Sequence, residues 1–196
     1  MADTSRTVTD MASNLFQDSQ AAGSITPQDL RDLVETCQTK QGSIYVSTAS
    51  ATTIAGAANV DPASLTNMVA VETAATFTLS TAPTANEFDM NTDGQLRYTG
   101  TPTTNVFFTA SVMLEIVNSG VDLELVMAVT KGGTIVTGAK TGGFCPRIHT
   151  NSVPMSVSGF ASMATNDYLN IFVGNVDSTV NVLARMGQLT AFSLVT

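Results

Sequence analysis

The segment VFFTASVMLEI, residues 106–116, determines the fold class that this sequence predicts. Its side chains separate into two sets when alternate positions are grouped. The first set contains Val106, Phe108, Ala110, Val112, Leu114 and Ile116, and the second contains Thr109, Ser111 and Glu115. Successive side chains of a β-strand point to opposite faces of a sheet, so this period of two predicts a strand with one buried face.

The apolar segment that follows, residues 121–129, repeats the same alternation. Asn118-Ser119-Gly120 lies between the two segments and predicts a turn, so we expect residues 106–116 and 121–129 to pair as a hairpin. Lys131-Gly132-Gly133 predicts a second, tight hairpin into residues 134–136, because glycine accepts the positive φ angles of such turns. This part of the chain is therefore expected to form consecutive antiparallel strands.

Shorter segments of the same kind occur on both sides of this region. They are residues 43–47, 68–71, 76–79, 153–158, 168–173, 180–184 and 189–195. Residues 48–67, rich in alanine, serine and threonine, predict a looping cover. So many short strands without intervening helices are typical of a two-sheet sandwich, and the fold class we expect is all-β: an antiparallel jelly-roll sandwich with a short N-terminal arm and helix.

The N-terminal segment differs from this pattern. Residues 1–23 are mostly polar and predict an arm, and a helix is expected next because Thr26 can cap it and Pro27 suits its first position. Leu30, Val34 and Cys37 recur at the spacing of a helical stripe. A helix this short is marginal alone, so we expect it to dock on its own sandwich or on the matching helix of a neighbour. The expected division is residues 1–40 for the arm and helix and 41–196 for the sandwich.

The composition excludes several classes of partner. The 196 residues carry a net charge of −8 and only 12% charged side chains. The eight basic residues are scattered singly, so neither nucleic acid nor an anionic membrane surface is an expected partner. No apolar run approaches the ~18 residues of a membrane span, and the start lacks the features of a signal peptide, so synthesis in the cytoplasm is expected.

One motif resembles the start of a calcium-binding EF-hand loop. The sequence Asp89-Met90-Asn91-Thr92-Asp93-Gly94 has the right opening, but Gly100 stands where the bidentate glutamate is required and Arg97 adds a cation nearby. The flanking residues alternate like strands. We expect a β-turn, in which asparagine and aspartate bond to local amides and glycine accepts positive φ. Calcium binding is the alternative.

Few residues suggest catalysis. His149 is the only histidine, and on a strand Cys145 would lie roughly 13 Å from it, at ~3.3 Å per residue, which is beyond the reach of proton transfer. The alternative is a loop that closes this gap. Cys37 and Cys145 are expected to be small buried hydrophobes, because two cysteines make no disulfide framework. The carboxylates do not cluster either: Glu115, Asp122 and Glu124 fall on solvent-facing positions. We expect a protein that is not an enzyme and has no cofactor or metal.

Three segments together resemble a known family. They are ITPQDLRDLV (25–34) followed by GSIYV (42–46), FDM through LRYTG (88–100), and NDYLNIFVGN (166–175). They are similar to small structural proteins of tailed bacteriophages, known as head fibre, tail fibre or decoration proteins, whose C-terminal domains resemble the trimeric tumour-necrosis-factor-like jelly roll. The resemblance covers residues 24–196 and implies a homotrimer with one sheet of each subunit around the three-fold axis.

A trimer would account for apolar side chains at positions expected to face outward. Phe107, Met113, Val117 and Val126 lie at such positions in the two best strands, and they are the candidate trimer interface. The alternative for any one of them is a cover within the subunit, by the helix or by residues 48–67.

The expected function is that of a virion protein on the exterior of a phage capsid. Attachment to the major capsid protein or another virion protein is expected through the N-terminal segment, with Leu15, Phe16, Ile25 and Leu30 as candidate contacts. The alternative is a tail-fibre-type module whose loops bind a receptor on the host surface.

Overall fold

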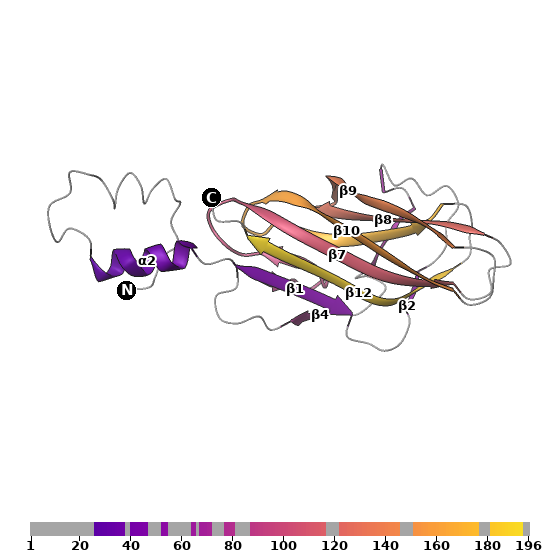
Figure 1. The fold of residues 1–196 in the computed structure, drawn as a ribbon, viewed down its shortest axis with the longest axis horizontal. Coiled ribbons are helices and arrows are strands. Elements are labelled where there is room, and N and C mark those ends of the chain that lie inside the picture. The colour runs from indigo at the N-terminus through magenta and orange to yellow at the C-terminus, as the bar shows by residue number, and fades with distance from the viewer. Residues whose placement is uncertain are drawn as a thin grey trace.

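Two antiparallel β-sheets face each other to form a sandwich, and a short helix precedes them (Figure 1). The computed structural model describes residues 26–37, 40–46, 52–54, 64–65, 67–71, 77–80, 87–116, 122–145, 151–176 and 181–193. The first sheet has the order β10-β7-β12-β1-β4, with β2 beside β12. The second has the order β5-β6-β11-β8-β9, with β3 beside β11. The strands β10-β7-β12-β1 and β6-β11-β8-β9 form the two four-stranded layers of a jelly roll, so the predicted fold class is confirmed.

The elements have the following bounds. The helix is α2 (Pro27–Cys37), and the strands are β1 (Gln41–Val46), β2 (Thr52–Ile54), β3 (Val69–Ala70), β4 (Phe77–Ser80), β5 (Phe88–Met90), β6 (Leu96–Tyr98), β7 (Thr104–Ile116), β8 (Leu123–Lys131), β9 (Thr134–Cys145), β10 (Asn151–Met163), β11 (Tyr168–Asn175) and β12 (Val182–Ser193).

The predicted hairpin between residues 106–116 and 121–129 is wrong. β7 pairs with β10 and β12, whereas β8 lies in the opposite sheet and pairs with β11 and β9. The alternation in sequence shows only that each strand has a buried face, and both strands meet that condition from opposite sides of one core. The outward sides of β7 and β8 therefore lie on opposite surfaces of the molecule.

Two further strand boundaries differ from the expected ones. Residues 180–184 and 189–195 were expected as two strands, but 182–193 form one strand, β12, with an irregularity in its pairing between Ala184 and Met186. The extra residue at this β-bulge changes which alternate positions face the core, so the period-two pattern is interrupted without ending the strand. Residues 141–143, whose two adjacent glycines are typical of a connection between strands, belong instead to β9.

The core lies between the sheets and contains the residues that the alternation predicted. Val106, Phe108, Ala110, Val112 and Leu114 are all at most 3% exposed. Across the β10–β7 pair, Gly159 lies opposite Phe108, and a Cβ atom at position 159 would stand 2.9 Å from Phe108 Cζ. Glycine at this position leaves the room that the ring occupies. The hairpin at Gly132 and Gly133 is also confirmed, with φ angles of 54° and 81°.

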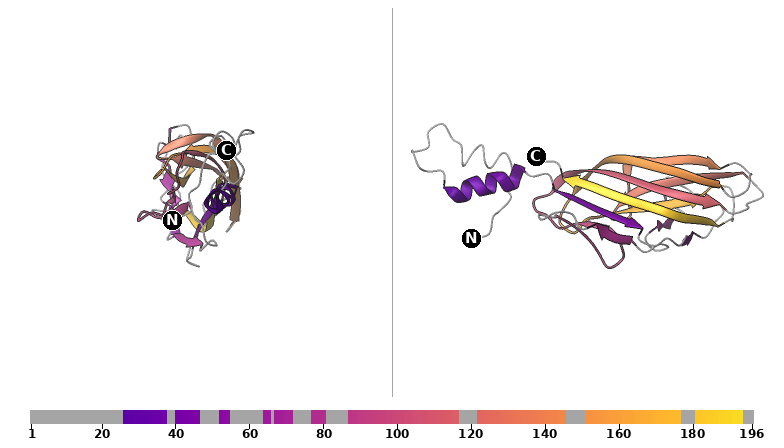
Figure 2. Two further views of the ribbon diagram at one scale, coloured as in Figure 1. Left: turned by 90° about the vertical axis from the view of Figure 1, so that its left-hand side faces the viewer. Right: turned by 60° about the horizontal axis from the view of Figure 1, so that its bottom comes forward.

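The helix has the start that the sequence predicts. The Asp29 amide donates to Thr26 Oγ1 at 3.2 Å, and the Thr26 amide donates to Asp29 Oδ2 at 2.8 Å. This reciprocal capping satisfies amides that the first turn leaves without helical partners. Figures 1 and 2 show α2 beyond one end of the sandwich, next to the start of β1.

Asp167 stabilises the connection between β10 and β11, and its contribution to the stability of the fold depends on pH. Its Oδ2 accepts hydrogen bonds from the Ala164 amide at 2.9 Å and Lys131 Nζ at 3.1 Å. The Ala164 amide bond, and then Lys131, hold the pKa of Asp167 below its ordinary value of 3.8. Because the folded pKa is lowered, the stabilisation is present above about pH 4 and is lost as the pH falls through the folded value.

We therefore predict that Asp167→Asn lowers the free energy of unfolding by about 0.5 to 1 kcal/mol at pH 7. The difference from the unmodified protein should shrink at pH 3. Urea unfolding at both pH values measures this, with Asp93→Asn as the control because Asp93 is exposed in the turn between β5 and β6. An Asp167→Asn effect that is equal at both pH values would contradict the assignment.

Candidate functional site

The outer surfaces of the two sheets differ in the number of charged residues and in how far other parts of the chain cover them. On the second sheet, Asp89 and Arg97 form an ion pair at 2.6 Å, and Glu124 and Lys140 are exposed. Part of that surface is also covered within the chain, where Met68 and Leu65 contact Val126, Ala128 and Phe172 in a small apolar cluster. The second sheet thus has the charged and partly covered outer surface of an ordinary solvent-facing layer.

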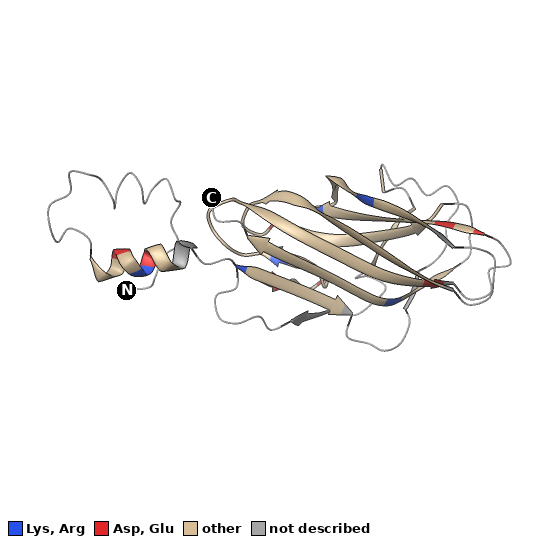
Figure 3. Ribbon diagram, viewed as in Figure 1, with Lys and Arg blue, Asp and Glu red and all other residues tan. Residues whose placement is uncertain are grey.

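The first sheet has an outer surface of a different kind, which we call the uncharged face. It consists of Phe107, Thr109, Ser111 and Met113 of β7, Pro154, Ser156, Ser158 and Phe160 of β10, Met186, Gln188, Thr190 and Phe192 of β12, and Gln41, Ser43 and Tyr45 of β1. None of these fifteen residues is lysine, arginine, aspartate or glutamate. Figure 3 shows these four strands tan over most of their length, with charged residues near their ends.

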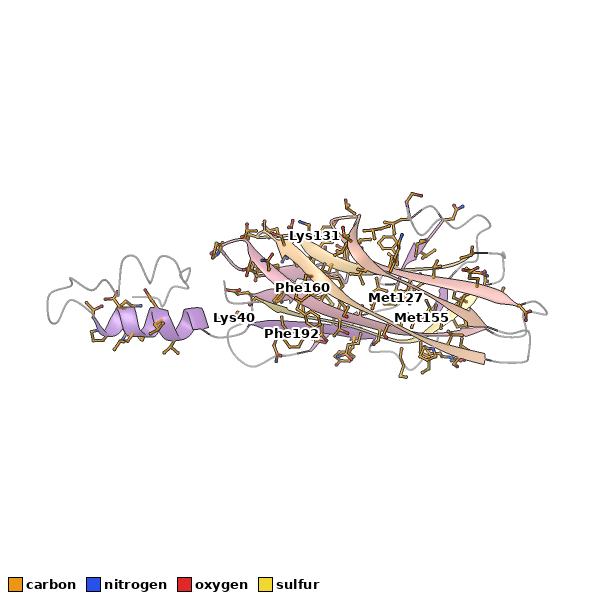
Figure 4. The ribbon with its side chains drawn as sticks, turned by 45° about the horizontal axis from the view of Figure 1, so that its top comes forward. Lys40, Met127, Lys131, Met155, Phe160 and Phe192 are labelled. Atoms are coloured by element: carbon orange, nitrogen blue, oxygen red, sulfur yellow. The ribbon has the colours of Figure 1, made fainter. Side chains whose placement is uncertain are left out.

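Three phenylalanines form a row at one end of this face. Phe107 lies opposite Phe160 on β10 and opposite Phe192 on β12. The Phe107 and Phe160 rings are 5.2 Å apart, and Phe160 is 64% exposed. Figure 4 shows Phe160 and Phe192 near Lys40, at the end of the sandwich from which the helix leaves. We call these three phenylalanines the phenylalanine row. In the isolated chain, the row exposes the large apolar side chain of Phe160 to water.

Hydroxyl and amide side chains occupy the middle of the face. Ser43 Oγ and Thr190 Oγ1 lie 2.9 Å apart, and Gln188 Nε2 donates to Thr190 Oγ1 at 3.2 Å. Thr109 of β7 is paired with Thr190, and Ser158 of β10 is paired with Thr109, so these hydroxyl groups extend the row across the sheet. Such groups can be covered by a partner at much lower cost than charges, because their remaining hydrogen bonds can be made to the partner.

Beyond the hydroxyl groups the face is hollowed. Tyr45, Met113, Pro154 and Met186 line part of a depression of about 590 Å³. Met113 lies opposite Pro154 on one side and opposite Met186 on the other, and Met186 is 58% exposed. Methionine side chains adapt their shape to what they contact, so this depression suits a protein surface better than a small rigid ligand.

An ion pair marks the far edge of the face. Arg185, at the bulge in β12, binds Glu115 of β7 with two nitrogens, and Nη2 lies 2.9 Å from Oε1. The hydrogen bond from Arg185 lowers the pKa of Glu115, and the hydrogen bond to Glu115 raises that of Arg185. The two charges compensate each other at the rim, where polar groups of interfaces are usually found.

The structure places three of the four candidate interface residues, and they do not share one surface. Phe107 and Met113 lie on the uncharged face, six residues apart along β7. Val126 is only 6% exposed and belongs to the cluster with Met68 on the opposite sheet, so the cover within the subunit, the alternative left open by the sequence, applies to it. We therefore remove Val126 from the candidate interface. Val117 lies outside the described residues.

Of the candidate attachment residues, only Leu30 is described. It lies on α2 and is 52% exposed. Leu15, Phe16 and Ile25 lie outside the described residues, so the structure does not test them.

Sequence reasoning missed most of the uncharged face. Phe160, Phe192, Met186 and Tyr45 had not been singled out. Phe160 could have been found, because it shares its alternate positions with Ser156 and Ser158 rather than with the core residues Met155 and Ala161. Met186 follows the bulge, so its direction does not follow from alternation along the strand.

The segment that resembles a calcium loop forms a turn. The Gly94 amide donates to the Asn91 carbonyl oxygen at 3.1 Å, and Gly94 has a φ of 77°. Asn91 Oδ1 accepts the Asp93 and Gln95 amides at 3.1 and 2.9 Å. Asp89, the first ligand of the calcium alternative, is bound by Arg97 Nε and Nη2 at 2.8 and 2.6 Å. The predicted β-turn is confirmed, and Arg97 occupies the carboxylate that a calcium ion would need.

The other candidates for chemistry are not placed. His149 lies outside the described residues, and the side chains of Cys37 and Cys145 are not described. Within the described ranges, no group of three or more histidine, cysteine, aspartate and glutamate side chains is arranged to hold a metal ion. No helix in this part of the chain has the length and apolar character needed to cross a membrane.

Comparison with known proteins adds little beyond the shape. No protein family model matches the sequence, and no curated protein matches it. Among solved structures, the chain is similar to the structure of Eiger TNF from S. frugiperda, with 11% sequence identity and a TM-score of 0.47. The match covers 80% of this chain and 92% of that chain. A likeness at this level gives no information about partners or function.

Proposed function

We propose that this protein is a non-enzymatic structural subunit that assembles with copies of itself through the uncharged face. The observation that supports this is the difference between the two outer surfaces. One is charged and partly covered by Leu65 and Met68 of the same chain, whereas the other exposes Phe160, Met186 and Tyr45 with no charged residue between them. An uncharged face that exposes large apolar side chains around a hydroxyl-rich middle, with an ion pair at its rim, is typical of a protein interface.

The proposed assembly is a homotrimer on the exterior of a tailed-phage capsid. The number three and the virion come from the resemblance of residues 24–196 to phage head fibre and decoration proteins, and the face comes from the structure. In a ring of three copies around an axis that runs along the strands, residues at the same height along the axis lie next to each other. The phenylalanine rows would therefore meet each other, and so would the methionine-lined depressions. Each part of the face would then contact a chemically similar part of the neighbouring copy.

The arrangement of the described titratable groups supports a structural role over catalysis. Those with shifted pKa values are engaged in fastening strands: Asp167 with Lys131, Glu115 with Arg185, and Arg97 with Asp89. The pKa of Tyr98 is raised by burial and by Glu87, and its hydroxyl donates to the Pro102 carbonyl oxygen at 3.0 Å. None of these groups lies on the uncharged face, so the proposed site needs no acid or base.

Attachment to the shell is assigned to the N-terminal arm. The helix, with which the described part of the chain begins, lies beyond one end of the sandwich (Figure 2). Of the four candidate contacts, the three that precede the helix, Leu15, Phe16 and Ile25, would be buried against the capsid protein or another virion protein, and the copies of one assembly would add avidity.

We predict that deletion of residues 1–23 leaves the assembly intact but abolishes its binding to particles. The sandwich and helix begin after the deleted segment, so the secondary structure seen by circular dichroism and the number of copies per assembly, obtained from the native mass, should match those of the full chain. Co-sedimentation with capsids that lack the protein measures binding. A truncated protein that still co-sediments at the level of the full chain would contradict the assignment of the arm.

The tail-fibre-type alternative, a module that binds a host receptor, is distinguished by copy number. Quantitative mass spectrometry of purified virions gives the ratio of this chain to the major capsid protein. A ratio typical of a shell component supports the capsid role, whereas the few copies of a single tail would favour the receptor-binding role.

A further inference from the structure

The helix α2 exposes apolar side chains and buries a charged one, which is the reverse of what its sequence pattern requires. Leu30 and Val34, one helical turn apart, are 52% and 59% exposed, whereas Asp32 on the opposite side is 1% exposed. Asp32 accepts a hydrogen bond from Gln28 Nε2 at 2.7 Å. Residues at i and i+4 share a helix face, so Leu30 and Val34 form one apolar stripe that is in contact with solvent in the isolated chain.

The end of the helix is held close to the uncharged face. Only residues 38–40 separate α2 from β1, and the backbone is fixed at Lys40, whose amide donates to Ser193 Oγ at 3.2 Å and whose carbonyl accepts the Ser193 amide at 2.8 Å. Three residues span at most about 11 Å. The next residue, Gln41, lies opposite Phe192 of the phenylalanine row. The helix therefore leaves from the same end of the face as its most exposed aromatic residue.

We propose that the α2 helices of the assembled copies pack against one another through Leu30 and Val34, as a short parallel bundle that extends the interface beyond the phenylalanine row. This inference depends on the proposed assembly through the uncharged face. When copies meet through that face, each brings its helix to the same end within the reach of a three-residue connection. The partner of the stripe is then a second copy of the same stripe.

The length of the helix explains why it needs the tether. Eleven residues give a helix of about 16 Å, too short to associate stably as separate peptides. Joined to an assembled sandwich, the helices are held at an effective concentration in the millimolar range. The spacing of Leu30, Leu33 and Val34 matches the apolar positions of a parallel coiled coil, and Asp29 and Arg31 flank the stripe on its two sides.

Cysteine cross-linking tests the contact directly. In the full chain with Cys37→Ala and Cys145→Ala, Leu30→Cys should form disulfide-linked subunits under mild oxidation. Arg31→Cys is the matched control, because Arg31 is exposed on the same helix but lies off the stripe. Cross-linking at position 30 and little at position 31 supports the bundle. Absence of cross-linking at position 30, with the native mass still that of an assembly, overturns it and leaves the uncharged face in place.

A second measurement avoids any change to the cysteines. Leu30→Gln with Val34→Gln keeps good helix formers, and it should raise the concentration at which the assembly dissociates by about tenfold or more, because apolar contacts between copies are lost. Arg31→Gln should leave this concentration unchanged. If the double variant keeps the assembly but loses binding to capsids, the stripe contacts the shell and the bundle is wrong. A single-chain mass for the unmodified protein would overturn the proposed assembly itself.

Discussion

Phe160→Asp is expected to convert the assembled protein into a folded monomer. Phe160 is 64% exposed in the isolated chain, so its own subunit loses little when the ring is removed. In the assembly, the change removes the burial of a phenylalanine, worth about 1.5 to 3 kcal/mol, and places a carboxylate without a partner in an apolar row. Together these weaken each subunit contact by at least about 100-fold.

Sedimentation equilibrium at micromolar concentration measures the result. The variant should have the mass of one 20.4 kDa chain, with the circular dichroism spectrum of the unmodified protein. Thr137→Asp on β9 is the matched control, because it puts the same charge at an exposed position of the second sheet. An assembly that is equally stable with aspartate at position 160 would show that the phenylalanine row is not part of the interface.

Phe108→Ala, by contrast, should lower the stability of the fold itself. Phe108 is fully buried between the sheets and its ring stands over Gly159, so truncation leaves a cavity that the neighbouring backbone cannot fill. We predict a decrease of about 3 to 5 kcal/mol in the free energy of unfolding. Phe107→Ala, one residue earlier and on the outer face, should cost less than about 1 kcal/mol in the monomer.

Both substitutions are best compared in the Phe160→Asp background, where assembly does not contribute to the measured stability. Urea unfolding followed by circular dichroism gives the two values. Similar losses for Phe107→Ala and Phe108→Ala would contradict the division of β7 into a core side and an interface side.

The sequence was sufficient for the parts of the fold that depend on local chemistry. The alternation from Val106 to Leu114 predicted a strand with one buried face, Gly132 and Gly133 predicted a tight hairpin, and Thr26 and Pro27 predicted the start of the helix. In each case a few neighbouring residues determine the conformation, through the period of two, positive φ or capping.

Sequence reasoning failed where contacts between distant segments of the chain determine which strands pair and which side chains are covered. Nothing within residues 106–129 shows whether two amphipathic strands pair or lie in opposite sheets, so the expected hairpin was wrong. The same limitation affected the candidate site. Val126 and Met113 both follow an outward pattern, but Met68 covers Val126 from a remote part of the chain, whereas Pro154 and Met186 flank Met113. The bulge between Ala184 and Met186 concealed the direction of Met186.

The measurement that tests the uncharged face most directly is the rate at which Met186 is oxidised by peroxide, followed by mass spectrometry of peptides. Met186 is 58% exposed in the isolated chain, whereas an assembled partner would cover it. We predict that Met186 reacts at least about tenfold more slowly in the unmodified protein than in Phe160→Asp, while Met90 on the second sheet reacts equally in both. Equal rates for Met186 in the two proteins would show that this face is in contact with water, and that copies of the chain do not meet through it.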